Sequence, residues 1–343
     1  MVVTKNNLSH SYLLIRIDKQ PDGGRKNFYN IKSVMELSNL KYQVIFENYK
    51  SMTSYIKLII SIVLFSGNRF IVNQAFLCLC VYVSTIFQAK KIIYIIDSID
   101  NNYPKGFKNK IKGVVVVCIN KFLSQRKNIY FISETNYLKE KFKSCNKSFV
   151  INTPYPDAIN ILPLRKASFR SNSIIRLLYV GRLSEEKGVL NLIDFIKRSK
   201  NKNYCISIIG DGDFRDQIQL LCVKNKNVTY HGWMENEDIL KLYYENDILI
   251  HFPNKDAYPT VFREAFSNAL PIVSLEIQGI PEIITTGKDG ELLPYYSYAL
   301  VEEKVDKIAK DLKFYSENAL CKSAKNNFQI YCKNLLSVFK MIN

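Results

Sequence analysis

Apolar positions fall into two successive series of short runs, separated by amphipathic and polar segments. In the first half of the chain the runs are SYLLIRID, YQVIFENY, RFIVN, KIIYIID, NIYFISE and SFVINT, with helical patterns such as FYNIKSVMELSNL between them. Apolar runs bounded by turn residues are typical of buried strands, and strands that alternate with helices predict parallel βα units. We therefore expect the first half to form a doubly wound α/β domain.

The alternation starts again after the turn-rich, basic segment NTPYPDAINILPLRKASFRSNS. The later strand-like runs are IIRLLYV, NYCISIIG, NVTYHG, DILIHF, PIVSL and GELLPY. The chain has 343 residues, enough for two domains of about 150 residues each. The expected fold class is α/β, with two Rossmann-like parallel-sheet domains that face a central cleft and a linker near residues 158–172.

The longest apolar stretch runs from Phe70 to Phe87 and approaches membrane-spanning length. Asn73 and Gln74 interrupt it near one end, so we interpret it as a buried strand that leads into a buried helix. The first residues, MVVTKNNLSHSYLLIRI, lack the basic and then apolar pattern of a signal sequence. A cytoplasmic location is therefore expected.

The cysteines and histidines give no sign of a metal site. None of the eight cysteines forms a CxxC pair, and most lie in apolar runs, which predicts buried free thiols. The three histidines are scattered along the sequence, which argues against a histidine-based metal site.

Positive charge is concentrated in the first half. Residues 1–160 contain 23 Lys and Arg against 9 Asp and Glu, a net charge of +14, whereas the whole chain carries +17. Such an excess favours an anionic partner, which could be nucleic acid, a phospholipid surface or a phosphate-bearing substrate, although it also fits a role in solubility.

Two cations follow a predicted strand directly in the loop GRLSEEKG. Because Gly181 ends the strand, Arg182 and Lys187 are expected at the carboxyl edge of the sheet, where open α/β sheets bind ligands. Cations beside a helix N-terminus can hold a diphosphate. Taken alone, the loop also fits a solvated surface turn that pairs with Glu185 and Glu186.

The other glycine-rich segment, IIGDGDFRD, is a weak dinucleotide fingerprint, because Arg215 stands where the third glycine is needed. We interpret it as a tight turn between a strand and a helix. The sequence contains no GxxxxGK[ST] motif, so P-loop phosphoryl transfer is not expected.

Two acids lie in DAYPTVFREAFSNALPIV, at the end of the predicted strand DILIHF. Asp256 precedes the predicted helix and Glu264 lies about one turn inside it. Ionised carboxylates in these places suit hydrogen bonds to sugar hydroxyls, because each accepts several bonds. The alternative is that Asp256 caps the helix and Glu264 lies on a solvated face.

The stretch DAYPTVFREAFSNALPIVSLEIQGIPEII resembles the signature of the retaining glycosyltransferases of family 4 (glycosyl transferases group 1), which have the GT-B fold. Glu264 and Ala265 match the second acid and its neighbour in the family pattern E-G-[FY]-P-x4-E-A. LLYVGRLSEEKGVLNLIDFI matches the strand, G-R-L-x3-K-G loop and helix, and IIGDGDFRDQI matches the I-G-x-G-x2-R element. The resemblance is strong over residues 174–295 and extends to the first half only in layout.

The resemblance implies a nucleotide-diphosphate sugar as donor, a glycan or polyprenyl-diphosphate-linked acceptor, and neither metal nor other cofactor. Arg182, Lys187 and Asp256 would be the catalytic residues, the two cations on the diphosphate and the acid on hydroxyls of the transferred sugar. Glu264 would bind the nucleotide ribose. The other donor-binding positions would be Gly181, Tyr258, Pro259, Thr260 and Val261, together with Gly23 and Gly24 in the first loop after a strand.

The resemblance also implies an acceptor-binding domain over 1–160, a donor-binding domain over 165–324, and a last helix, 325–343, that packs back on the first domain. The implied reaction is sugar transfer with retention of anomeric configuration, in the synthesis of a bacterial capsule, O-antigen or lipopolysaccharide. Peripheral contact with an anionic membrane is a further expectation from the charge of the first half.

The sequence departs from the family pattern in three places. Asp256 replaces a glutamate, Ala257 replaces a glycine, and no His-Asp element follows KIIYI, where Asp97 and Asp100 stand instead. The alternative function is therefore a degenerate, non-catalytic module that binds a nucleotide or glycan. A nucleic-acid partner is not expected, because the basic half carries no recognised nucleic-acid-binding motif.

Overall fold

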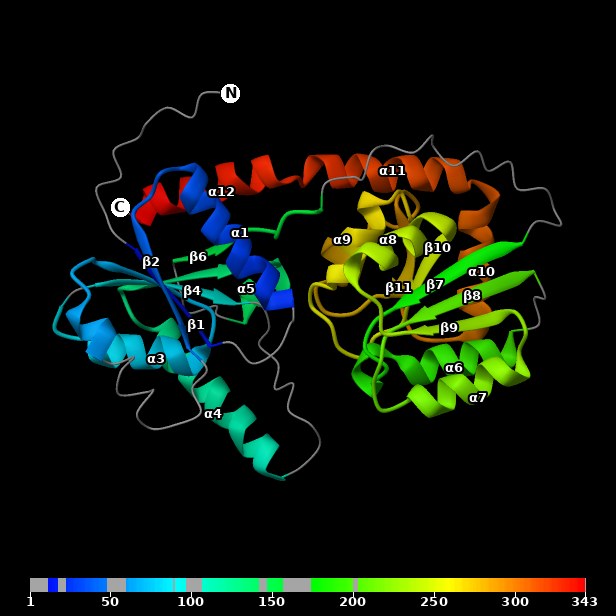
Figure 1. The fold of residues 1–343 in the computed structure, drawn as a ribbon, viewed down its shortest axis with the longest axis horizontal. Coiled ribbons are helices and arrows are strands. Elements are labelled where there is room, and N and C mark those ends of the chain that lie inside the picture. Colours follow the sequence, from blue (N-terminus) through cyan, green and yellow to red (C-terminus); the bar gives the residue numbers. More distant parts are fainter. Residues whose placement is uncertain are drawn as a thin grey trace. The chain divides into compact units, whose positions relative to one another are not determined.

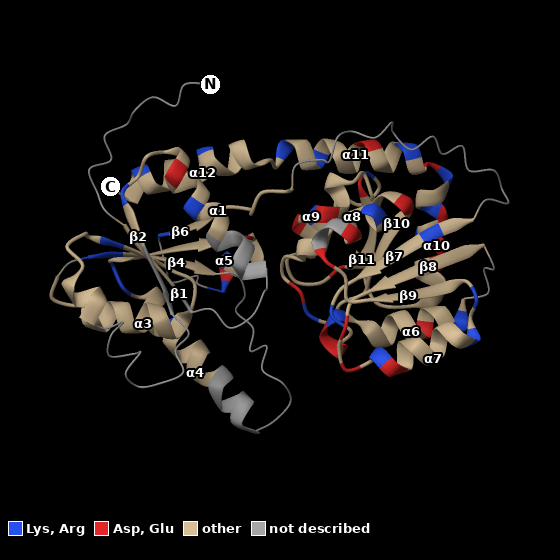
Figure 2. Cartoon of the chain, in the orientation of Figure 1, with Lys and Arg blue, Asp and Glu red and all other residues tan. Residues whose placement is uncertain are grey.

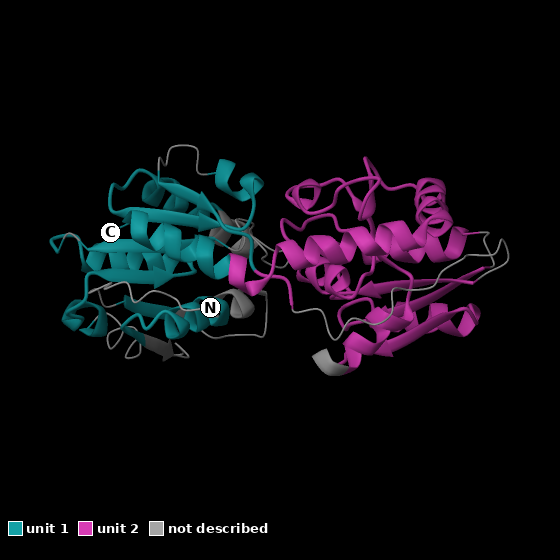
Figure 3. Ribbon diagram, turned by 90° about the horizontal axis from the view of Figure 1, so that it is seen from above, with its two compact units in different colours: residues 1–153, 331–343 teal, residues 154–330 magenta. Residues whose placement is uncertain are grey.

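The computed structural model describes residues 12–17, 23–47, 60–88, 90–96, 107–141, 147–156, 174–199 and 203–342. The chain divides into two compact units, shown in Figure 3. Unit 1 consists of residues 1–153 and 331–343, and unit 2 of residues 154–330. The linker expected at 158–172 lies outside the described residues, as do Asp97 and Asp100.

Unit 1 is built on a parallel sheet with strand order β2-β1-β3-β4-β5-β6. The strands are β1 (Tyr12–Ile17), β2 (Tyr42–Glu47), β3 (Arg69–Val72), β4 (Lys91–Ile96), β5 (Ile129–Ser133) and β6 (Ser148–Val150). The helices are α1 (Gly23–Leu37), α3 (Ala75–Ser84), α4 (Phe107–Ser124), α5 (Asn136–Glu140) and α12 (Phe328–Ile342). The predicted doubly wound sheet is confirmed (Figure 1).

Helix α12 completes unit 1 from the far end of the sequence. The ring of Phe339 lies 5.3 Å from that of Tyr12, a buried residue of β1. Lys91 Nζ in β4 donates a hydrogen bond to the carbonyl oxygen of Ile342 at 2.5 Å. The last helix therefore packs on the sheet that the first strands form.

Unit 2 repeats the architecture with strand order β12-β11-β10-β7-β8-β9. Its strands are β7 (Ile175–Val180), β8 (Tyr204–Ile209), β9 (Val228–Gly232), β10 (Ile248–His251), β11 (Ile272–Leu275) and β12 (Gly290–Leu293). Its helices are α6 (Val189–Arg198), α7 (Arg215–Lys224), α8 (Asn236–Glu245), α9 (Thr260–Ser267), α10 (Tyr298–Lys310) and α11 (Leu312–Lys325), with 3-10 turns η1 (Glu185–Lys187) and η2 (Ile280–Glu282).

Alternate residues of each strand in unit 2 face opposite layers of helices. Leu177 and Tyr179 of β7 pack in one core with residues of α6, α7 and α10, whereas Leu178 and Val180 pack in the other with residues of α8, α9 and α11. Both faces of the sheet are thus covered, which explains why its strands are near-continuous apolar runs.

The long apolar stretch differs in part from its interpretation. Residues 70–72 are buried in β3 as expected, but the helix that follows is buried on one side only. Phe87, just beyond α3, is 97% exposed. Among the described helices, none has the length and apolar character needed to cross a bilayer.

The described cysteines are all free. The burial expected for them holds for Cys78 but is wrong for Cys118 and Cys321, which are exposed on α4 and α11.

Candidate active site

The strand order of unit 2 reverses at β7, and this reversal indicates the edge of the sheet at which a ligand would bind. From β7 the chain adds β8 and β9 on one side, and then β10, β11 and β12 on the other. In open α/β sheets the crevice for ligands lies outside the carboxyl ends of the two strands at such a switch point. Here those strands are β7 and β10, and the loops that follow them are 181–188 and 252–259.

Glycines allow these loops to approach one another closely. Gly188 has a φ of +72°, and a Cβ placed on it would lie 1.6 Å from the carbonyl oxygen of Phe252, at the end of β10. A Cβ on Gly210, after β8, would lie 1.9 Å from the carbonyl oxygen of Gly181. IIGDGDFRD thus forms the predicted turn between β8 and α7, and its glycine permits backbone contact.

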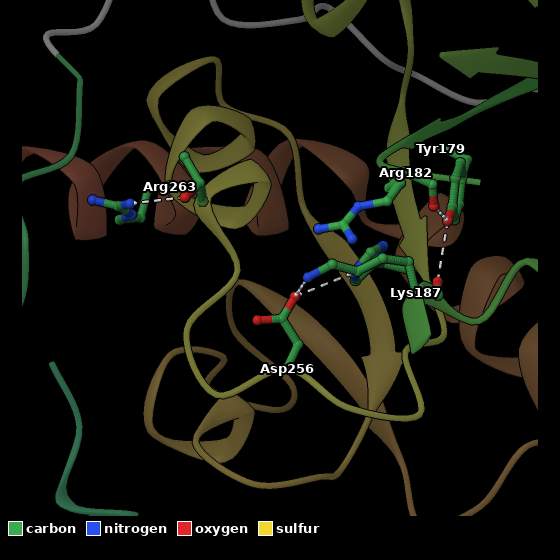
Figure 4. A network of polar contacts seen from close by, with 7 residues as sticks. Tyr179, Arg182, Lys187, Asp256 and Arg263 are labelled. Carbon is green, nitrogen blue, oxygen red and sulfur yellow. Dashed lines mark hydrogen bonds and ion pairs between the residues drawn. The ribbon is translucent and has the colours of Figure 1, made fainter. Parts of the chain in front are cut away.

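An ion pair joins the two loops at the switch point. Lys187 Nζ contacts Asp256 Oδ2, and Figure 4 shows the two side chains pointing toward one another. The Asp256 side chain is 11% exposed and that of Lys187 26% exposed. The buried Tyr179 of β7 supports the loop from below, because its hydroxyl donates to the Lys187 carbonyl oxygen at 3.1 Å.

The carboxyl group of Asp256 is held in its charged form. Burial raises the pKa of Asp256, but the contacts with His251 and Lys187 lower it more, so that it lies below its ordinary value of 3.8. Both contacts are made by Oδ2. Oδ1 makes neither of these two contacts.

Arg182 lies in the same loop as Lys187, as predicted, and is exposed. Figure 4 shows its side chain running alongside that of Lys187. The guanidinium group of Arg182 forms no ion pair with the described residues. A planar guanidinium group and an ammonium group side by side form a cationic pair suited to a diphosphate.

His251 is a residue of this site that sequence reasoning missed, because the three histidines look scattered. It ends β10 and is 1% exposed, between the rings of Tyr179 and Phe262 at 5.7 and 5.5 Å. Its Nε2 lies 3.9 Å from Asp256 Oδ2, beyond hydrogen-bond distance, and neither ring nitrogen has a hydrogen-bond partner. The signal in the sequence was a histidine inside an apolar strand just before the acid.

Replacing His251 with phenylalanine should reduce the acid sensitivity of unit 2. Burial lowers the pKa of His251 below its ordinary 6.5, so the unfolded chain takes up a proton that the folded chain does not. As pH falls below 6.5, the free energy of unfolding then drops by at most about 1.4 kcal/mol per pH unit for this group. Asp256 stays ionised in this range because its pKa is lowered.

The measurement is urea unfolding of wild type and His251→Phe at several pH values. His231→Gln is the comparison variant: burial lowers the pKa of His231 too, but that side chain is more exposed and Glu245 opposes the shift, so its removal should have a smaller effect. The assignment of the acid sensitivity to His251 would be wrong if the free energy of unfolding depended on pH as in wild type in His251→Phe but less steeply in His231→Gln.

Helix α9 carries the remaining predicted donor-site residues of unit 2. It begins at Thr260 after Pro259, so the first N–H groups of the helix are directed toward the loop that holds Asp256. The side chains of Tyr258 and Pro259 are buried and that of Val261 half-buried, which leaves their backbone as the part available to a ligand. The backbone role expected for Tyr258–Val261 stays a prediction.

Arg263 anchors this helix and was not anticipated from the sequence. It is buried, and its Nη1 and Nη2 donate to the Pro154 carbonyl oxygen at 3.3 Å and to Thr260 Oγ1 at 3.1 Å. Its guanidinium group also lies 5.1 Å from the centre of the Tyr258 ring. Arg263 thus holds the start of α9 in place.

Glu264 is half-buried and held by a neighbouring helix. The hydroxyl of Tyr243 in α8 donates to Glu264 Oε2 at 3.0 Å. Burial and the Glu264 carboxylate together raise the pKa of Tyr243 well above 10, so the phenol remains a donor at all ordinary pH values. The alternative of a solvated face residue therefore does not describe Glu264.

Two predicted donor-site residues belong to the other unit. Gly23 and Gly24 lie in unit 1, and they form the first turn of α1 instead of the loop expected for them.

In the described residues, no three His, Cys, Asp or Glu side chains are grouped as a metal site requires. Metal independence stays a prediction.

Comparison with known proteins identifies the region that contains the site. Residues 164–326 match the family model of the glycosyl transferases group 1. This segment is a glycosyl transferases group 1 domain. The site at the switch point therefore lies inside the glycosyltransferase domain of the chain.

Solved structures show the fold of the whole chain. The structure of Anabaena HepE in complex with UDP and glucose is 15% identical, covers 97% of this chain and 100% of that one, and gives a TM-score of 0.74. The two parallel sheets thus have the GT-B fold, as expected.

Curated relatives match over shorter stretches. An uncharacterized 41.2 kDa protein in the cps region of Klebsiella pneumoniae is 29% identical over 159 residues, which are 45% of this chain and 42% of that protein. The amylovoran biosynthesis glycosyltransferase AmsK of Erwinia amylovora is 32% identical over 137 residues, which are 35% and 32% of the two chains. The match thus spans less than half the length of these relatives.

Proposed function

We propose that this glycosyltransferase moves a sugar, with retention of configuration, from a nucleotide-diphosphate sugar to a glycan or polyprenyl-diphosphate-linked acceptor. The observation that carries the proposal is the ion pair of Lys187 with Asp256 at the switch point, beside the exposed Arg182. The cps-region and amylovoran relatives support a place in bacterial surface polysaccharide synthesis. We place the reaction in the cytoplasm.

The cations would stabilise the leaving group. The Lys187 ammonium group has three donors, so it can keep one on Asp256 and direct the others to the β-phosphate. As the bond from the anomeric carbon to the phosphate oxygen breaks, negative charge grows on the diphosphate while the sugar becomes oxocarbenium-like. Lys187, Arg182 and the N-terminus of α9 would stabilise that charge without moving.

Asp256 would set the position of the transferred sugar. Its Oδ1 would accept a hydrogen bond from a sugar hydroxyl, while Oδ2 keeps Lys187 in place. The acceptor hydroxyl would attack from the face that the diphosphate leaves, and its proton would pass to the departing phosphate oxygen. This route needs no histidine from unit 1.

Glu264 would bind the ribose of the nucleotide. A carboxylate accepts hydrogen bonds from two adjacent hydroxyls, and Tyr243 fixes its orientation before the donor arrives.

A thermal-shift panel of nucleoside diphosphates tests the proposal. Uridine diphosphate comes first, because HepE was solved with it. A bound nucleotide at about a hundred times its Kd adds about 2.7 kcal/mol to the free energy of unfolding, which raises the Tm by several degrees. Glu264→Ala should abolish the shift and Tyr243→Phe should reduce it, whereas Tyr295→Phe, at an exposed tyrosine, should keep it.

The outcomes separate the alternatives. No shift with any nucleotide would contradict the donor site. A shift without donor hydrolysis or transfer would favour the non-catalytic binding module. A product whose anomeric configuration is inverted, as seen by NMR, would contradict retention alone.

A further inference from the structure

His251 is a polar side chain buried in unit 2 without a hydrogen-bond partner for its ring among the described residues. It ends β10, a strand on which Figure 2 shows no Lys, Arg, Asp or Glu, and it is 1% exposed. A neutral imidazole carries one donor and one acceptor, and leaving both unsatisfied in a core costs free energy that an apolar side chain would not cost. A histidine in this place therefore calls for a functional explanation.

Packing fixes the direction in which the imidazole points. The ring lies between the rings of Tyr179 and Phe262, both of which are fully buried. Its Cε1, the atom between the two nitrogens, would lie 3.7 Å from a Cβ placed on Gly181. The edge of the ring that carries the nitrogens thus faces the loops of the candidate active site.

Asp256 lies near this edge, just outside hydrogen-bond distance. Its Oδ2 is 3.9 Å from Nε2, about 1 Å longer than a usual N–H···O hydrogen bond. A carboxylate on this side favours the tautomer in which Nε2 carries the proton. Asp256 belongs to the loop between β10 and α9, so its side chain can turn by this distance while the packed ring stays in place.

A bound donor would give Asp256 a reason to turn. In the structure its Oδ2 is held by Lys187, but the diphosphate of a donor would compete for the same ammonium group. The carboxylate is only 11% exposed, and a buried charge needs hydrogen bonds in place of water. His251 is the other group that Oδ2 faces.

We propose that His251 is a positioning residue: its Nε2–H donates to Asp256 Oδ2 once a diphosphate competes for Lys187, and this bond orients the carboxylate toward a sugar hydroxyl. The role rests on the proposed function, because it requires a nucleotide-diphosphate sugar at the site. It leaves Lys187 available to the leaving group without leaving Asp256 unpaired.

Steady-state turnover at pH 8 tests this role, with a nucleotide sugar that wild type accepts among the uridine- and guanosine-diphosphate hexoses. Burial lowers the pKa of His251, so the ring is neutral at this pH and acts only through hydrogen bonds. His251→Phe keeps a ring without an N–H and should lower kcat at least about tenfold, because misplacement by about 1 Å can cost about a hundredfold. His251→Gln, whose side-chain amide can donate, should retain most of the wild-type kcat.

Three further measurements separate positioning from a structural role. The thermal shift with the matching nucleoside diphosphate, which lacks the sugar, should be the same in His251→Phe as in wild type. Ile250→Val, a buried substitution in the same strand, should lower stability without lowering kcat. In an Asp256→Asn background, His251→Phe should cost less than it does in wild type, because the carboxylate that it orients is gone.

The role of His251 would be wrong if His251→Phe had wild-type kcat, if the Phe and Gln variants lost kcat equally, or if the losses added up in the double variant. Wild type turns over its nucleotide sugar in each of these cases. A wild type that turns over none of the nucleotide sugars would instead contradict the proposed function, and the role of His251 with it.

Discussion

Lys187→Ala lowers kcat for sugar transfer or donor hydrolysis by about 10²- to 10³-fold, the loss expected when one preorganised stabiliser of leaving-group charge is removed. Lys187 is the group that both touches Asp256 and faces the site proposed for the diphosphate. The measurement is steady-state turnover with the nucleotide sugar that the panel identifies. Lys197→Ala, which removes one exposed charge from α6, should turn over at the wild-type rate.

A stability control separates catalysis from folding in this experiment. Removing Lys187 leaves the Asp256 carboxylate, which is 11% exposed, without its cation and lowers the free energy of unfolding. Lys187→Ala combined with Asp256→Ala should recover part of that stability and none of the turnover. Recovery of activity in the double variant, or wild-type turnover in Lys187→Ala, would show that Lys187 only neutralises the charge of the Asp256 carboxylate and does not stabilise the leaving group.

Gly188→Ala should destabilise unit 2 by more than about 4 kcal/mol, in the range where a single substitution threatens folding. Two penalties combine: a left-handed φ of +72° and a Cβ 1.6 Å from the Phe252 carbonyl oxygen. The contact is with backbone at the end of β10, so relief requires that the two loops of the site move apart. The free energy of unfolding in urea is the quantity to measure.

Gly287→Ala measures the cost of the left-handed backbone conformation alone. Gly287 has a φ of +77°, and nothing lies within 4 Å of a Cβ placed there, so its substitution should cost only the left-handed term of about 1–2 kcal/mol. If Gly188→Ala does not accumulate as folded protein, resistance to proteolysis compared with Gly287→Ala gives the same ranking. Equal costs at the two positions would show that the loops are not held together at Gly188.

The sequence predicted the strands and helices, and it predicted that Arg182, Lys187 and Asp256 lie at one edge of the sheet. Arg182, Lys187 and Asp256 each follow an apolar strand, and parallel strands end at a common edge. The pairing of Lys187 with Asp256 could not be predicted from the sequence. The two residues are 69 positions apart, and they meet because β10 lies beside β7 in the sheet. Periodicity predicts strands but does not give their order.

The other features that the sequence did not predict depend on how side chains pack in the folded protein. Tyr243 acquires its role from the residues around it when it is buried, and nothing in its local sequence distinguishes it from a core residue. His251 stands inside an apolar strand just before Asp256, but the strand alone does not show that the two side chains meet. The run that contains α3 is apolar on all sides, and such a pattern cannot separate a fully buried helix from one with an exposed apolar side. Gly23 and Gly24 were expected in a loop, but the first turn of a helix also accepts glycine.

The return of α12 to unit 1 sets an order for events during synthesis. Tyr12 in β1 is synthesised before residues 154–330, and its partner Phe339 is synthesised after them. Unit 2 is a single uninterrupted stretch, so it can fold while the chain is still growing. The unit that is started first is therefore finished last, because the part of its sheet that α12 covers has no partner until α12 has been synthesised.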